Sequence, residues 1–138
     1  MKRKIISLLL VVVALFCFAS CGGGQVKCSL ADVGETQVVI AVEEMDEKAT
    51  LLNCMEYLAT EEGFVYELVG GMLTSINGKA NAADFSSCWM LYTSDTEMAN
   101  TAWGTVEYNG ETLGSAIVGA ETLVVAEDEI YVWVYQSF

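Results

Sequence analysis

The 138-residue sequence contains no histidine and no proline, and it has only six lysines and arginines against 19 aspartates and glutamates. The lack of histidine removes the commonest general base, so any catalysis would depend on carboxylates or on a lysine. No nucleophile elbow is present, and the serines at 86 and 87 have no base beside them in sequence. We therefore do not expect an enzyme.

The first 20 residues are built like a lipoprotein signal peptide. A basic start, Met1–Lys4, precedes an apolar run over residues 5–19 that is shorter than the roughly 20 residues of a membrane-spanning helix. Ser20 and Cys21 end the run as in a bacterial lipobox. We expect cleavage after Ser20, a lipid on Cys21 and a protein anchored to the outside of the cell membrane. The alternative is an ordinary signal peptide or an uncleaved anchor, in which Cys21 has no role.

Cleavage would leave a very acidic protein. The mature chain would keep three basic residues, Lys27, Lys48 and Lys79, and all 19 acidic ones, so its net charge would be −16. Such a surface repels nucleic acid, and we expect no nucleic-acid partner. It tolerates neutral or cationic ligands, although solubility alone also explains the charge.

Three of the five cysteines remain once one is removed with the signal peptide and Cys21 is lipidated. Cys28, Cys54 and Cys88 would lie in a compartment where disulfides persist. They allow one bridge, and the sequence leaves the pairing open. Their wide spacing argues against a zinc site, and the acidic residues 127–129 lack the spacing of a calcium loop. We therefore expect no metal.

The hydrophobic pattern predicts a lipidated tether at 21–36 and one domain at 37–138. Alternating apolar residues predict a strand at 37–43. A single apolar stripe predicts a helix at 47–61, with Asp46 as its N-cap and Gly63 closing it.

The rest of the chain is expected to be β-structure, which makes the fold class α+β. The turn signals Asn77-Gly78 and Asn109-Gly110 separate apolar segments. Residues 79–87 and 94–102 are expected to be loops. Strands are predicted at 64–68, 72–76, 88–93, 104–108, 121–126 and 130–136.

Five short motifs between residues 49 and 138 follow one another in a familiar order. They are Leu51-Leu52, Gly71-Met72-Leu73-Thr74-Ser75-Ile76-Asn77-Gly78, Cys88-Trp89-Met90-Leu91-Tyr92, Leu123-Val124-Val125 and Ile130-Tyr131-Val132-Trp133-Val134-Tyr135. Together they resemble the C-terminal domain of the transcobalamin and intrinsic factor family. They also resemble its bacterial relatives, a domain of unknown function often found in surface lipoproteins.

This resemblance implies a β-grasp-like mixed sheet with one helix on one face. In the vitamin carriers the domain closes over cobalamin, so a corrinoid is an implied ligand, while no bound cofactor is expected. The implied ligand contacts are Ser75, Ile76, Asn77, Gly78, Trp89 and Tyr92. Residues 103–108 depart from the family pattern as an apparent insertion.

The last predicted strand has one aliphatic and one aromatic face, because side chains alternate along a strand. If the aliphatic set lies under the helix, the aromatic set faces the other side and forms a recognition patch. The alternative is that residues 94–122 cover the aromatic set and make it a second small core. The aliphatic set is Ile130, Val132 and Val134, and the aromatic set is Tyr131, Trp133 and Tyr135.

These features predict a surface-anchored module that captures a small or medium ligand, such as a corrinoid, and hands it to a transporter. The alternative is a protein-interaction or adhesion module that uses the same aromatics or an exposed sheet edge. A ligand module should have a concave pocket beside Trp89 or Trp133. An adhesion module should have a flat patch or an open edge.

Overall fold

The computed structural model describes residues 25–138. The predicted signal peptide and the predicted lipidation site, Cys21, lie outside the described residues. Among residues 25–138, no helix is both long enough and apolar enough to cross a membrane.

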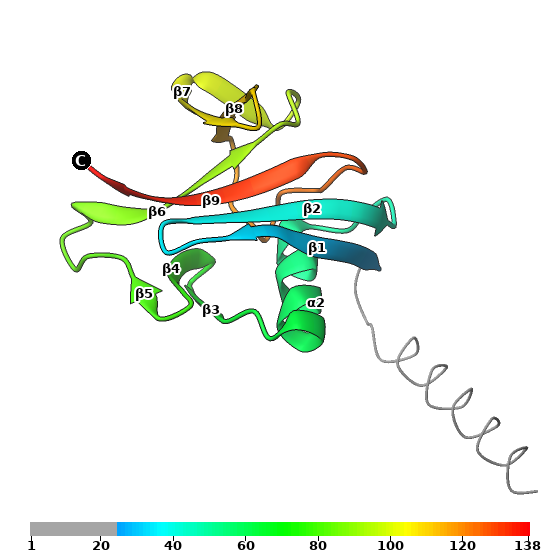
Figure 1. Cartoon of the computed structure of the whole chain (residues 1–138), viewed down its shortest axis with the longest axis horizontal. Coiled ribbons are helices and arrows are strands. Elements are labelled where there is room, and N and C mark those ends of the chain that lie inside the picture. Colours follow the sequence, from blue (N-terminus) through cyan, green and yellow to red (C-terminus); the bar gives the residue numbers. More distant parts are fainter. Residues whose placement is uncertain (1–24) are drawn as a thin grey trace, which may run out of the picture.

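The described chain forms two antiparallel sheets and one helix (Figure 1). The main sheet has the strand order β1-β2-β9-β6-β8-β7, and β3-β4-β5 form a small sheet. Helix α2 and the small sheet lie on one side of the main sheet, and the β7–β8 hairpin curls over the other side. The elements are β1 (Val26–Val33), β2 (Gln37–Met45), α2 (Leu51–Glu62), β3 (Tyr66–Val69), β4 (Met72–Ile76), β5 (Lys79–Ala80), β6 (Ser87–Thr93), β7 (Ala99–Tyr108), β8 (Glu111–Ala116) and β9 (Ile130–Ser137).

The described chain is mostly antiparallel sheet with a single helix, which is consistent with the expected α+β class, but the expected mixed sheet is wrong. Every strand pair within residues 25–138 is antiparallel. β2 and β6 are both antiparallel to β9, so they run in the same direction. Because β9 lies between β2 and β6, these two parallel strands, which helix α2 connects along the chain, are not hydrogen-bonded to each other.

The predicted tether at 21–36 is wrong over residues 26–33, which form the edge strand β1. This strand pairs with β2 from Val26 opposite Met45 to Val33 opposite Val38, with two irregularities in register. Val26, Cys28 and Leu30 alternate with Lys27 and Ser29 and pack toward the main core, but this pattern spans only five residues, and sequence analysis missed the strand. The folded domain therefore includes β1 and extends further toward the N-terminus than residue 37.

The helix begins at Leu51, four residues after the predicted start. Thr50 is the N-cap: its hydroxyl accepts a hydrogen bond from the Asn53 backbone, and the Asn53 side chain accepts one from the Thr50 backbone. Asp46 instead accepts a bond from the Lys48 backbone and stabilises the preceding turn. Gly63 ends the helix in the left-handed conformation, as predicted.

The strand predicted at 121–126 is wrong. This segment makes only an isolated bridge, between Val124 and Thr50. The first N–H groups of a helix have no partner within the helix. Here carbonyl groups of Leu123, in this segment, and of Ala120, just before it, accept their hydrogen bonds. Leu51 N donates to Leu123 O, and Leu52 N donates to Ala120 O.

Strand β9 has one aromatic and one aliphatic face, as predicted. The helix covers the aromatic face, however, whereas we expected it to cover the aliphatic one. Tyr131 and Trp133 pack in the main core with the helix residues Leu51, Met55 and Leu58. Val132 packs on the other side in a second core, against Val39, Tyr92 and Leu113. The β7–β8 hairpin covers the aliphatic face rather than the aromatic one. The aromatic set is therefore not an exposed patch.

Candidate functional site

An apolar cleft opens on the helix side of the main sheet, where the small sheet packs beside it. Its volume is about 420 Å³, within the range that accommodates small ligands. The two buried tryptophans of the aromatic motifs, Trp89 and Trp133, contribute to its lining. We call it the tryptophan cleft; its walls include Leu68, Gly70, Gly71, Met72, Leu73, Leu91, Gly119 and Ala120.

Asn81 holds the two walls of the cleft together. Its Nδ2 donates to the carbonyl oxygen of Leu73 on β4 at 2.8 Å, and its Oδ1 accepts from the backbone N of Trp89 on β6 at 2.9 Å. One side chain thus fixes the small sheet against the main sheet. These two hydrogen bonds set the distance between the β4 wall and the β6 wall of the cleft.

The rim of the cleft exposes apolar surface beside a carboxylate. Val69 and Met72, which flank the glycine turn between β3 and β4, are 67% and 50% exposed. Exposed apolar groups beside a concave site are typical of recognition surfaces. The Glu121 carboxylate lies close to Gly71, where an added Cβ would be 3.0 Å from Oε2. The rim therefore favours ligands without negative charge.

Most polar groups of the predicted aromatic contacts already have partners inside the protein. Trp89 Nε1 donates to Lys79 O at 2.8 Å, and Tyr135 Oη donates to Ala80 O at 2.9 Å. Tyr92 Oη donates to Gln136 Oε1 at 2.7 Å, and Tyr131 Oη accepts from Ala126 N at 2.8 Å. These four side chains stabilise the fold. Of them, only Trp89 lines the cleft.

The predicted turn contacts lie outside the tryptophan cleft. Ser75 and Ile76 are buried in β4, and Asn77 and Gly78 form the turn into β5 with positive φ angles of 49° and 84°. Asn77 N donates to Val65 O at 2.8 Å, which ties the turn to the segment before β3. The cleft lies at the other end of β4, beside its first residues.

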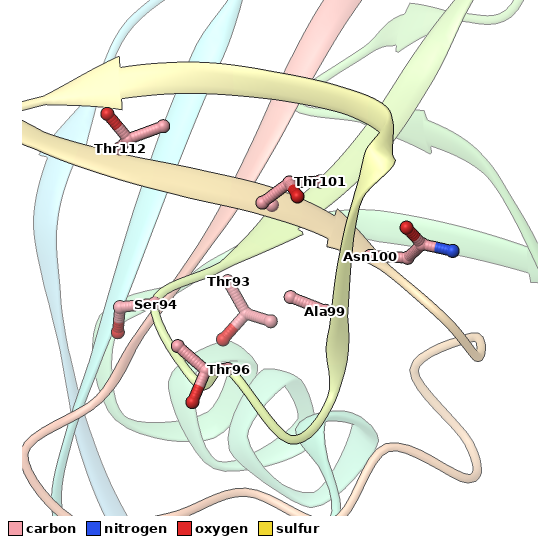
Figure 2. Close-up of a pocket in the computed structure, with 8 residues that line it drawn as sticks. Thr93, Ser94, Thr96, Ala99, Asn100, Thr101 and Thr112 are labelled. Carbon is pink, nitrogen blue, oxygen red and sulfur yellow. The ribbon is translucent and has the colours of Figure 1, made fainter.

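A second, polar pocket of about 290 Å³ lies under the β7–β8 hairpin (Figure 2). Thr93, Ser94 and Thr96 contribute hydroxyl groups from the end of β6 and the turn after it. Much of this polarity is used by the fold: Thr93 Oγ1 donates to Ile130 O at 3.0 Å, and Ser94 Oγ is bonded to the Glu129 carboxylate. We therefore consider the tryptophan cleft the better candidate site.

The three thiols separate into a pair and a single residue. Cys28 and Cys54 are both buried, and the neighbouring Cys54 thiol, together with burial, raises the pKa of Cys28. Cys88 lies apart, at the tryptophan cleft, with its Sγ 3.7 Å from Met90 Sδ. Among residues 25–138, no group of three or more acidic or cysteine side chains is placed to hold a metal ion.

No protein-family description, curated protein or solved structure matches this chain. The transcobalamin-like character of the motifs therefore stays a prediction. Sequence analysis identified Trp89 and Trp133 but missed the opposite wall, which comes from Leu68, Leu73 and residues 119–120. The Gly70-Gly71 pair between two short apolar segments was the available signal for that wall.

Proposed function

We propose that this protein is a lipid-anchored, extracytoplasmic binding module that captures a small apolar ligand in the tryptophan cleft. The observation that carries the proposal is the concave site beside both Trp89 and Trp133, which is the surface expected of a ligand module. Capture rather than catalysis is proposed, because the sequence has no histidine and the cleft is lined mainly by apolar residues.

The proposed ligands include a corrinoid, taken up with the help of a transporter. The motif resemblance supports this choice. The cleft volume of about 420 Å³ limits it, because a whole corrinoid is much larger, and only an edge of one would enter. The fold is proposed to be a variant of the β-grasp, in which the second strand rather than the first lies beside the last strand.

Filling the cleft tests the proposal more cleanly than removing a tryptophan. Trp133→Ala would empty the core and cost about 3 to 5 kcal/mol of stability, so lost binding would be ambiguous. Gly119 lines the cleft, and an added Cβ would meet only Gly71 O, at 3.8 Å. Gly119→Leu should therefore fold and occlude the cleft. Thr122→Leu, on the exposed turn beyond it, is the matched control.

The measurement is calorimetric titration of the intact protein with cobinamide and with cobalamin. We expect micromolar binding of cobinamide that Gly119→Leu abolishes and Thr122→Leu retains. Binding that both variants retain would place the ligand elsewhere. If neither corrinoid binds, the corrinoid proposal fails, while the cleft can still be tested with smaller apolar probes.

The alternative function, a protein-interaction or adhesion module, is favoured by one observation. β7 is an edge strand of the main sheet, and Trp103 on it is 64% exposed. An open edge and an exposed tryptophan are features of protein-binding surfaces. Adhesion to other cells that is lost in Trp103→Ala but kept in Gly119→Leu would favour this alternative.

A further inference from the structure

The three tryptophans of the chain differ in what their indole N–H groups bind. Trp89 Nε1 donates to Lys79 O at 2.8 Å, and Trp103 is 64% exposed to solvent. Trp133 is 5% exposed, and its Nε1 is buried without a hydrogen-bond partner. It is the one such side-chain nitrogen or oxygen among residues 25–138.

A buried donor without a partner destabilises the folded protein, and for this reason native interiors contain few of them. The fold has found partners for the hydroxyl of Tyr131 and for the indole of Trp89, which lie in the same core. Trp133 is the exception, and it is also a lining residue of the tryptophan cleft. The one unpaired buried donor of the described residues therefore belongs to a side chain that lines the candidate site.

We infer that the tryptophan cleft selects neutral ligands that carry a hydrogen-bond acceptor on an apolar body, and that the acceptor pairs with Trp133 Nε1–H. This inference rests on the proposed function of the cleft. The apolar body would lie against Leu68, Leu73 and Trp89. A carbonyl oxygen or a ring nitrogen is the acceptor of the required kind.

The charges around the cleft make the ligand neutral rather than anionic. A carboxylate would also accept from Trp133, but placing it among apolar side chains carries a large desolvation penalty. It would also meet the Glu121 carboxylate near Gly71 at the rim. The predicted mature chain, at a net charge of −16, adds to this repulsion.

Reaching the donor requires a small local movement, because Nε1 itself is covered in the structure. Of the lining side chains, Met72 is 50% exposed and unbranched, which allows it to change rotamer at little cost. In the opposite wall, Gly119 and Ala120 are small residues and leave room for the ligand body beside Leu68 and Leu73. Binding therefore gives Trp133 Nε1–H the hydrogen-bond partner that it lacks in the core.

A pair of matched probes tests this inference: 1-indanone, which carries a carbonyl group, and indane, its hydrocarbon counterpart. The intact protein is labelled with ¹⁵N-tryptophan and held in lipid nanodiscs, because free detergent would compete for an apolar cleft. Its three indole N–H signals are followed during each titration. We expect 1-indanone to move the Trp133 proton downfield and indane to bind without that shift.

Trp133→Phe removes the donor and keeps an aromatic ring. It should weaken 1-indanone by about tenfold and indane much less, and the loss of an unpaired donor should offset part of the stability that the smaller ring costs. Trp103→Phe, outside the cleft, should change none of these values. A purely structural role for Trp133 would weaken both probes alike.

The outcomes separate the inference from the proposed function. If both probes bind in the cleft with equal affinity and the Trp133 proton does not respond to the carbonyl, the acceptor preference is wrong and the cleft stands. If neither probe moves the signals of Trp89 or Trp133, both the cleft function and the inference are overturned.

Discussion

The thiol of Cys28 on the edge strand β1 interacts with the thiol of Cys54 on helix α2, inside the main core. Sequence analysis left three pairings open, and the structure brings this one pair together. The two residues are not bonded in the structure, and Cys88 lies apart from them on β6. The neighbouring Cys54 thiol and burial raise the pKa of Cys28, so its reactive thiolate is scarce once the protein has folded.

We predict that protein matured in an oxidising compartment carries a Cys28–Cys54 disulfide and a free Cys88. The bond should stabilise the oxidised form by about 3 kcal/mol relative to the reduced form. Denaturing alkylation followed by mass spectrometry, with and without reductant, gives the pairing, and urea unfolding gives the stability. Denaturation is needed because burial alone would protect the thiols.

Cys88→Ser is the control for the bridge, and it should leave both results unchanged. Cys28→Ser and Cys54→Ser should each remove the difference between oxidised and reduced protein. A bridge that includes Cys88, or three free thiols in non-reduced protein, would contradict the prediction.

The second prediction concerns the start of the folded domain. A chain beginning at Gln25 keeps β1, whereas a chain beginning at Gln37 loses it and leaves β2 as an unpaired edge over an opened core. Unpaired apolar edge strands promote aggregation. We expect the first chain to unfold cooperatively in thermal circular dichroism and the second to aggregate. Equal melting temperatures for the two chains would show that residues 26–36 are a tether and do not belong to the folded domain.

The parts of the fold that depend only on a few neighbouring residues were predictable from the sequence. The apolar alternation of β2 and β9, the glycine at the end of α2 and both Asn-Gly turns depend on a few neighbouring residues, and each is confirmed. The edge strand β1 was not predictable in this way. Its apolar residues Val26, Cys28 and Leu30 alternate over only five residues, and the strand forms because β2 offers it hydrogen bonds along its full length.

The candidate site was predictable only in part, because it depends on tertiary packing. The sequence showed that Trp133 and Val132 lie on opposite faces of β9, but not which face the helix covers. That choice follows from the β7–β8 hairpin, whose Leu113 packs against Val132 and Tyr92. The opposite wall of the cleft comes from the small sheet and from residues 119–120, which are far from Trp133 along the chain.

The third prediction separates the observed helix cap from the one expected from the sequence. Thr50→Ala removes the side-chain half of the capping box and should destabilise the protein by about 1 kcal/mol. Asp46→Ala removes only a turn bond on an exposed segment and should change stability by less than about 0.5 kcal/mol. Urea unfolding of both variants gives the comparison. A larger effect for Asp46→Ala would mean that the helix begins earlier than Leu51.

The last prediction uses the buried phenol of Tyr131. Burial raises its pKa from 10.0 to about 12, although the hydrogen bond from Ala126 N, which favours the phenolate, opposes this shift. The folded protein therefore holds this proton more tightly than the unfolded chain does. The corresponding stability is fully present below pH 10 and is lost as the pH rises through 12. The loss over this window should be on the order of 2 kcal/mol.

Tyr131→Phe isolates this contribution from the general repulsion within an acidic protein. At neutral pH the variant should lose about 1 kcal/mol, because Ala126 N is left without its acceptor. Between pH 10 and 12 its stability should fall less steeply than that of the wild type. Urea unfolding at several pH values gives both slopes, and absorbance titration should show that the variant lacks the last of the six tyrosines to ionise. Parallel slopes would show that Tyr131 does not hold its proton through the alkaline range.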